Sequence, residues 1–214
     1  DRLLRVRSEV AAKPDFGATK QAPTLDHPMG TDRLGRDMLT RIMYGARAML
    51  LVGLLTQLAG LIIGVPLGII AGYAGGIFDW LVTRLIDLFS ALPWYLIVLF
   101  MVMVLSPSLE NLILALTITA WVGSARIVRG MSFSIREQDF VTASRALGES
   151  GRGILFRRIL PNALTPLVVQ GTLGIGGAIL EVAALSFLGL GAQPPLAEWG
   201  SMIALERNQL FNAP

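Results

Sequence analysis

The sequence predicts an all-α, polytopic transmembrane helix bundle, and three observations lead to that fold class. Hydrophobic residues make up 53% of the 214 residues and charged residues only 15%, which is too apolar for an ordinary soluble domain. Residues 49–72 carry no charge, and at about 1.5 Å per residue they can cross a hydrocarbon layer of about 30 Å. Seven arginines gather in residues 126–158, between apolar runs, as expected for a cytoplasmic membrane loop.

The chain is expected to begin with an extracytoplasmic arm, residues 1–30, because this part mixes charges of both signs and has few aromatic residues. A transmembrane helix domain is expected over residues 31–214. Its first element is a helix over residues 33–47, capped by Thr31 or Asp32.

Four membrane spans are predicted from the apolar runs, over about residues 48–73, 86–106, 109–128 and 162–190. In the first span, glycines recur every four residues, which predicts close packing of one face on another helix. Residues 195–210 read as a short extracytoplasmic helix whose Trp199 suits a membrane interface. The arginine-rich loop, residues 129–161, sets the orientation: it is predicted to be cytoplasmic, which puts residues 1–30 outside.

Within this loop, "DFVTASRALGESGRGILFRRILPN" has the pattern of a helix, a turn and a second helix. Asp139 is a candidate N-cap, and Gly148 suits a left-handed residue that ends the first helix. Ser150 can start the second helix, which is expected to end where Pro161 and Asn162 lead into the last span. A short helix rich in small residues at a membrane surface suits docking into a groove of a soluble partner.

The same stretch resembles the cytoplasmic loop of binding-protein-dependent ABC importer permeases. The family pattern is Glu-Ala-Ala, three residues, Gly, nine residues, then Ile-x-Leu-Pro. Ala143, Gly148, Leu160 and Pro161 occupy matching positions with that spacing. Thr142 stands where the family has Glu, Ser144 where it has the second Ala, and Arg158 where it has Ile. The missing Glu removes any salt bridge to the ATPase that this carboxylate makes elsewhere in the family.

Two further stretches, "HPMGTDRLGRDMLTRIMYGAR" and "LSFLGLGAQPPLAEWG", resemble signatures of the peptide and nickel branch of this family, in its second permease subunit. Together the three signatures cover residues 27–200. The resemblance implies the type I ABC importer permease fold with about six spans, so one span before Asp1 and one after Pro214 are expected to be missing from this sequence.

The resemblance also implies the function and the partners. The chain would form half of a translocation pathway for di- or oligopeptides in a bacterial or archaeal cytoplasmic (inner) membrane. It would pair with a homologous permease subunit, two ABC ATPase subunits, an extracytoplasmic substrate-binding protein and membrane lipid. ATP and magnesium would bind to the partner ATPases and no cofactor to this chain. The implied ATPase-coupling residues are Asp139, Thr142, Ala143, Ser144, Arg145, Ala146, Leu147, Gly148, Leu160 and Pro161.

Four further charged residues are candidates for pathway or partner contacts: Glu181, Asp32, Arg36 and Asp37. Glu181 is the one acid well inside a predicted span, where a carboxylate is costly and usually faces a cavity or a partner; it also lies near the span end, where a structural role is open. The other three are equally consistent with a capped helix carrying i,i+4 pairs, Asp32 with Arg36 and Arg33 with Asp37.

Several function classes find no support in the residues. The sequence has no cysteine and a single histidine, His27, and shows no HExxH or nucleophile motif, which argues against an enzyme and against a metal site. Basic residues without interleaved aromatics argue against nucleic acid. The alternatives left open are the same architecture importing nickel chelates or another small solute, and a non-transport membrane enzyme or scaffold.

Overall fold

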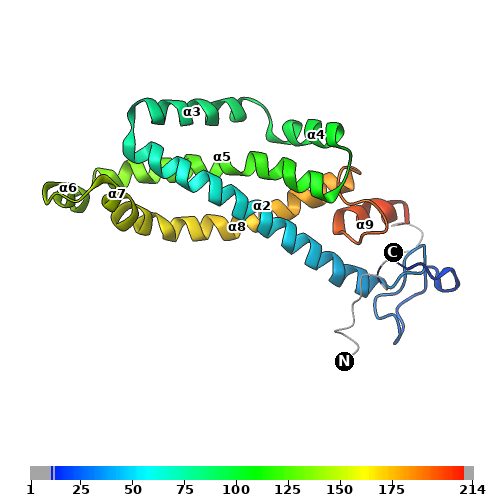
Figure 1. Ribbon diagram of the computed structural model, residues 1–214. Helices are drawn as coiled ribbons and strands as arrows, with labels where there is room; N and C mark the ends of the chain where they lie inside the picture. Colours follow the sequence, from blue (N-terminus) through cyan, green and yellow to red (C-terminus); the bar gives the residue numbers. More distant parts are fainter. Residues whose placement is uncertain (1–10, 12, 210–214) are drawn as a thin grey trace. The chain divides into compact units, whose positions relative to one another are not determined.

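The computed structural model describes residue 11 and residues 13–209, and this part of the chain is helical without a named strand. The all-α fold class is therefore confirmed. The helices are α2 (Met38–Ala74), α3 (Gly76–Ala91), α4 (Trp94–Leu105), α5 (Leu109–Arg136), α6 (Asp139–Ala146), α7 (Gly151–Ile154), a π-helical turn (Leu155–Ile159), α8 (Leu160–Phe187) and α9 (Trp199–Glu206), with short 3-10 helices at Phe16–Ala18 and Arg207–Gln209 (Figure 1).

Three helical stretches are long and apolar enough to cross a membrane. They are α2, α5 and the continuous stretch Gly151–Phe187, which joins α7, the π-helical turn and α8. The pair α3 and α4 passes the same test together but is bent by 77°, so it counts as a fourth span only if the two helices form one broken span.

The span predicted over residues 86–106 is not one continuous helix. The apolar run is divided between α3 and α4, and the break falls at Leu92 and Pro93. Leu92 has φ −101° and ψ 139°, the extended conformation that a following proline imposes, and proline itself has no N–H to continue the helix. In addition, α3 begins at Gly76, ten residues before the predicted start of the span at residue 86.

The separate helix predicted over residues 33–47 is also wrong, because it and the first span are one 37-residue helix that begins at Met38. Gly35 has φ +72°, a left-handed conformation that no helix contains. The Asp32 carboxylate accepts hydrogen bonds from the backbone N–H groups of Leu34 and Arg36, which closes a turn. Asp37 caps the helix instead, since its carboxylate accepts from the Thr40 N–H at 2.8 Å.

The chain divides into two compact units, which are described separately. The first unit consists of the described residues up to Gly53, Met101–Leu112 and the described residues from Gly177 on. The second unit consists of Leu54–Phe100 and Ile113–Gly176.

In the second unit, α2 and α5 pack so closely that their backbones nearly touch. A Cβ added at Gly64 would lie 2.6 Å from the carbonyl oxygen of Trp121. Ser132 on α5 donates a hydrogen bond to the Ile69 carbonyl at 3.0 Å. The close contact predicted from the small-residue repeat is therefore confirmed. The α2 glycines that meet α5 in this way are Gly60, Gly64, Gly68 and Gly72.

An ion pair joins α3 to α5 in the same unit. The Arg129 guanidinium donates from Nη2 to the Asp79 carboxylate at 2.8 Å and makes a second bond from Nε. Because the pair is bidentate and only partly exposed, it fixes the direction of α3 against α5 more firmly than a single surface contact would.

In the first unit, α9 lies against the start of α2. The Trp199 indole N–H donates to the Ile42 carbonyl at 3.0 Å. A Cβ at Gly45 would lie 2.9 Å from the Trp199 ring, so glycine makes room for the indole. The fully buried Glu198 caps α9 by accepting from the N–H groups of Gly200 and Ser201, both at 2.8 Å.

Candidate functional site

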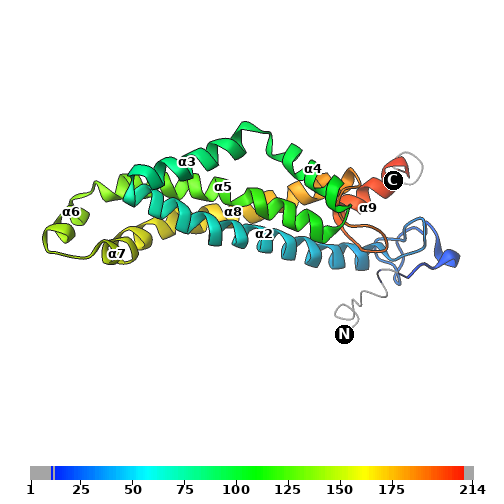
Figure 2. The same ribbon diagram turned by 45° about the horizontal axis from the view of Figure 1, so that its top comes forward.

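Residues 139–158, the segment that carries the family-like pattern, form a projection that we call the tip. It contains α6, a turn, α7 and the start of the π-helical turn, and both ribbon views show α6 and α7 beyond the ends of α5 and α8 (Figures 1 and 2). All of it belongs to the second unit.

The turn that ends α6 is a Schellman motif. The Glu149 N–H bonds to the Ser144 carbonyl and the Gly148 N–H to the Arg145 carbonyl, each at 3.1 Å. Gly148 has φ +80°, in the left-handed region that was expected for it. Ser150 then caps α7 by accepting from the Gly153 N–H at 3.2 Å, also as expected. The direction of the chain through this turn is thus fixed by backbone hydrogen bonds and one hydroxyl.

Within the tip, α6 has a buried inner face and an exposed outer face. Val141 is fully buried and Ser144 is 7% exposed, three residues apart on one side of α6. Leu147, at the helix end, is 88% exposed, although a leucine side chain gains by burial. The other exposed residues of α6 are Asp139, Phe140, Thr142, Ala143, Arg145 and Ala146.

The inner face joins the tip to the long helices of its unit. Val141 of α6 and Ile154 of α7 belong to one buried cluster with Ile135 of α5, Ile69 of α2 and Ile159. Because packed interiors transmit displacement rather than absorb it, a push on α6 must move the ends of these helices. The remaining members of the cluster are Val128, Leu155, Ala163 and Leu167.

The second helix of the tip does not end at Pro161, and this corrects the predicted boundary between the loop, residues 129–161, and the last span. The helix continues through the π-helical turn, where the Leu160 N–H bonds to the Leu155 carbonyl, five residues back. The wider turn accommodates a proline that has no N–H, and the Asn162 side chain donates to the Arg158 carbonyl at 2.6 Å. Leu160 is half-buried and Pro161 exposed.

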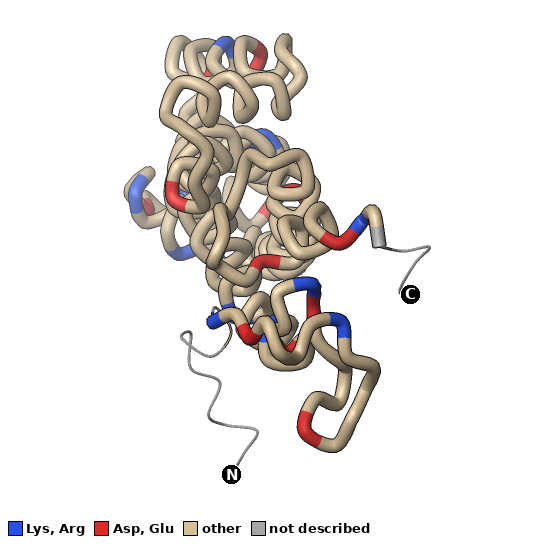
Figure 3. Tube along the Cα trace, turned by 90° about the vertical axis from the view of Figure 1, so that its right-hand side faces the viewer, with Lys and Arg blue, Asp and Glu red and all other residues tan. Residues whose placement is uncertain are grey.

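The sequence-predicted candidates near the start of α2 form a buried ion cluster in the first unit. The Arg36 Nε donates to the Asp32 carboxylate at 2.7 Å, and both side chains are no more than 3% exposed. Arg41, which the sequence reading missed, lies 3.7 Å from the same carboxylate and donates to the Ala11 carbonyl at 2.8 Å. Figure 3 shows charged segments close together in the chain that precedes α2.

Asp37 takes a different place, as the cap of α2. Its Oδ1 lies 3.1 Å from the His27 Nδ1. The predicted pair with Arg33 does not form, because the Arg33 guanidinium instead lies 3.7 Å from Glu206. Burial acts to raise the pKa of the Asp37 carboxyl, but hydrogen bonds from Thr40 and His27 and the charge of His27 lower this pKa below its ordinary value.

Glu181 lies in the part of α8 that belongs to the first unit, where it is half-buried. Among the described residues, none makes a hydrogen bond or an ion pair with its carboxylate. The contact with a pathway or a partner and the structural role, the two readings that the sequence left open, both stay predictions for Glu181.

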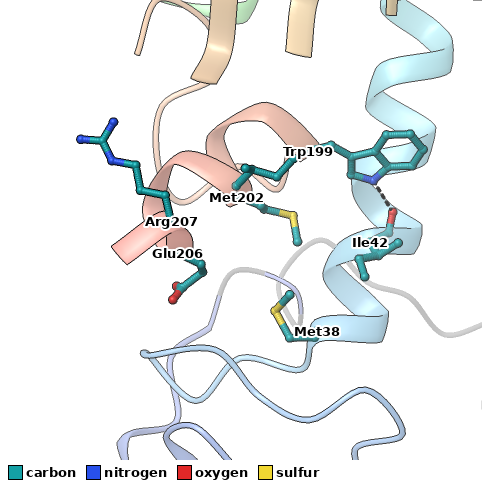
Figure 4. Close-up of a pocket in the computed structure, with 7 residues that line it drawn as sticks. Met38, Ile42, Trp199, Met202, Glu206 and Arg207 are labelled. Carbon is teal, nitrogen blue, oxygen red and sulfur yellow. Dashed lines mark hydrogen bonds between the residues drawn. The ribbon is translucent and has the colours of Figure 1, made fainter. Parts of the chain in front are cut away.

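A pocket of about 400 Å³ opens between α9 and the start of α2, a feature that the sequence reading did not anticipate. Figure 4 shows Trp199 and Met202 of α9 facing Met38 and Ile42 of α2, with Glu206 and Arg207 at one side. Ile203 completes the lining. The signal for it was the run of apolar residues after Glu198, but which helix that run would meet was not readable from the sequence.

Comparison with known proteins decides the family. Residues 64–209 match the family described as the binding-protein-dependent transport system inner membrane component. The chain belongs to this family. The chain is also 46% identical over 91% of its length to the dipeptide transport system permease protein DppC of Alkalihalophilus pseudofirmus, and 38% identical over 94% of its length to the oligopeptide transport system permease protein OppC of Bacillus subtilis.

The chain spans about two thirds of the length of these two curated relatives, 64% of the first and 67% of the second. A solved structure described as inward-facing conformations of the MetNI methionine ABC transporter is similar, with a TM-score of 0.68, 22% identity and coverage of 79% of this chain and 81% of that one. This similarity shows the fold alone. In the described part of the chain, no group of three or more metal-ligating side chains comes together.

Proposed function

We propose that this protein is the transmembrane permease subunit of an ATP-driven ABC importer and forms half of the pathway for di- or oligopeptides. It would lie in the cytoplasmic membrane of a bacterium or an archaeon, with the tip in the cytoplasm and the described residues up to 30 outside. The named relatives that transport dipeptides and oligopeptides support the substrate class. Family membership supports the general mode of action.

One observation carries the coupling role of the tip. α6 presents an exposed leucine at a rigid turn on its outer side, while on its inner side Val141 enters the core shared with α2, α5 and α8. A partner that binds Leu147 would therefore be connected through α6 to the ends of these three long helices. Movement of the ATPases would rock these helices between two states, one favoured by ATP and the other by its loss.

The protein itself would be non-catalytic, with ATP and magnesium bound by two partner ATPases. The remaining partners would be a homologous permease subunit, an extracytoplasmic substrate-binding protein and membrane lipid. Asp139, Thr142, Ala143, Ser144, Arg145 and Ala146 would line the contact with the ATPase, together with Leu147 and Gly148. Leu160 and Pro161 would join the tip to the last span.

The first test is purification of the full-length protein in mild detergent with identification of the proteins that accompany it. A second permease and ATPase subunits are expected. Reconstituted with the binding protein, the complex should import a labelled dipeptide when ATP is present, and a nickel chelate should not compete. Import of the chelate in place of the peptide would favour the nickel alternative. Purification without any ATPase would reopen the enzyme or scaffold alternative.

The Gly148→Val variant tests the coupling role of the tip. Valine is strained at φ +80°, by about 1 to 3 kcal/mol, but no atom lies within 4 Å of the position where its Cβ would be placed. The protein should therefore still assemble in the membrane. ATP-driven import should be lost, because the turn is altered. Gly148→Asn is the matched control, because asparagine tolerates the left-handed region. Normal coupled import by a well-expressed Gly148→Val variant would contradict the coupling role.

A further inference from the structure

The tip carries more positive charge than its own acidic residues neutralise. Glu149 is paired with Arg158 at 3.1 Å. Glu137, just before the tip, is paired with Arg136 at 3.0 Å. Three other arginines of the tip are exposed and form no ion pair with any described residue: Arg145, Arg152 and Arg157. Against them stands one acidic residue without an ion pair in the described part of the chain, Asp139, so the surface of the tip is positive.

The unpaired arginines of the tip lie next to exposed apolar side chains. Arg145 precedes Leu147 by two residues, and the Schellman motif holds both in one turn. Phe156, 62% exposed, adds a second apolar group near Arg157. An exposed leucine on a rigid turn loses little conformational freedom when it enters a pocket, which is the property of a binding anchor.

From this arrangement we infer the chemistry of the surface that receives the tip, an inference that rests on the proposed function. The receiving pocket on the ATPase subunit has an apolar wall where Leu147 enters and carboxylates on its rim, at least one of which faces Arg145. An arginine fork pairs with a carboxylate through two parallel hydrogen bonds, and complementary charge speeds encounter and fixes the register of docking.

The chain shows the departure from its family that this charge arrangement requires. Where the family pattern has Glu, this chain has Thr142, which is exposed and uncharged. The outer face of α6 therefore offers a cation at Arg145 and no carboxylate at position 142.

A protein pocket accounts for the tip better than a lipid surface does. Helices that lie on membranes have a broad face of bulky apolar residues along many turns. α6 has eight residues, and the exposed positions between Phe140 and Leu147 are threonine, alanine and arginine. In the ribbon views α6 also lies farther from the long apolar helices than the π-helical turn that carries Arg157 (Figures 1 and 2).

The inference is tested by the affinity of the purified ATPase subunits for the full-length permease complex in nanodiscs of phosphatidylcholine. Raising sodium chloride from about 50 to about 300 mM should weaken wild-type binding several-fold, because opposite charges are screened. Arg145→Glu should weaken binding about tenfold or more at low salt and reduce the salt dependence, and Arg145→Lys should keep most of both. Arg207→Glu on the 3-10 helix after α9, exposed and far along the chain from the tip, is the matched control and should bind as the wild type does.

The outcomes separate this inference from the function on which it rests. Arg145→Glu binding as tightly as the wild type, or salt-independent wild-type binding, would overturn the acidic rim, whereas loss of binding by Leu147→Asp would still uphold docking of the tip. Full binding by Leu147→Asp would reject the docking itself. If Arg145→Glu reduces binding only in nanodiscs that contain anionic lipid, the arginine serves the membrane and the inference fails.

Discussion

Arginine occupies two regions of this protein in opposite surroundings. Near the start of α2, Arg36 and Arg41 are buried around the carboxylate of Asp32. At the tip, Arg145 and Arg152 are exposed and have no ion pair in the described part of the chain. The difference teaches that the number of charges in a segment says little about their use, because burial decides whether a charge stabilises its own fold or remains free for a partner.

The energies differ accordingly. A buried charge cannot lose its partner without a large desolvation cost, so the cluster around Asp32 acts as a structural unit. An exposed arginine is solvated whether or not it is paired, and its removal costs the fold little. The start of α2 is therefore expected to be sensitive to substitution in stability, and the tip sensitive in partner binding.

The largest expected effect comes from removing the central carboxylate. Asp32→Ala leaves two buried guanidinium groups without their shared partner and should lower the free energy of unfolding by about 3 to 5 kcal/mol. Thermal unfolding of the full-length protein in detergent measures this loss. Two control variants sharpen the comparison: Asp26→Ala, in the same segment but exposed, and Arg152→Ala at the tip should each change stability by no more than about 0.5 kcal/mol. An Asp32→Ala variant as stable as these controls would abolish the distinction between the two regions.

An intermediate effect is expected at the contact between α9 and α2. Trp199→Phe keeps an aromatic ring but removes the indole N–H that donates to the Ile42 carbonyl. The loss should be about 1 kcal/mol, the usual net value of one hydrogen bond. Thermal unfolding of this variant measures how much the Trp199 hydrogen bond adds to the stability that the ion cluster gives the first unit. A loss as large as that of Asp32→Ala would show that the indole contributes equally.

The smallest effect is the pH dependence of stability that arises from Asp37, the residue that caps α2. The folded protein lowers the pKa of Asp37, so the ionised carboxylate contributes stability above the ordinary aspartate pKa of about 4, and this contribution falls as the pH drops through the folded-state value. The Asp37→Asn variant should therefore lose less stability than the wild type between about pH 5 and pH 3. Asp26→Asn should keep the wild-type slope; equal slopes in all three proteins would refute the assignment.

Local patterns in the sequence predicted what depends on neighbouring residues. The apolar runs predicted an all-α membrane protein, and the glycine repeat of α2 predicted a close helix contact. The spacing from Asp139 to Ser150 predicted the helix, the left-handed glycine and the second cap. These features were readable because chain length, side-chain size and backbone conformation act within a few residues of each other.

The predictions failed where a local signal competed with the surrounding structure. The run over residues 86–106 was predicted as one span, yet it is divided at Leu92 and Pro93 into α3 and α4. Pro161 was read as an end, yet a π-helical turn carries the helix past it. Both prolines lack the same N–H, but the chain is extended at Leu92 before Pro93, whereas a π-helical turn carries the helix into Pro161.

The sequence by itself determined the helical membrane class, the family and the turn that shapes the tip, since each rests on periodicity or on a pattern of fixed spacing within one segment. Only the tertiary structure decided which charges are buried. Arg41 was not singled out in the predicted helix, and Trp199 looked like an interface residue, until folding brought Asp32 to the first and α2 to the second. Burial depends on residues distant in the chain, and no local pattern reports it.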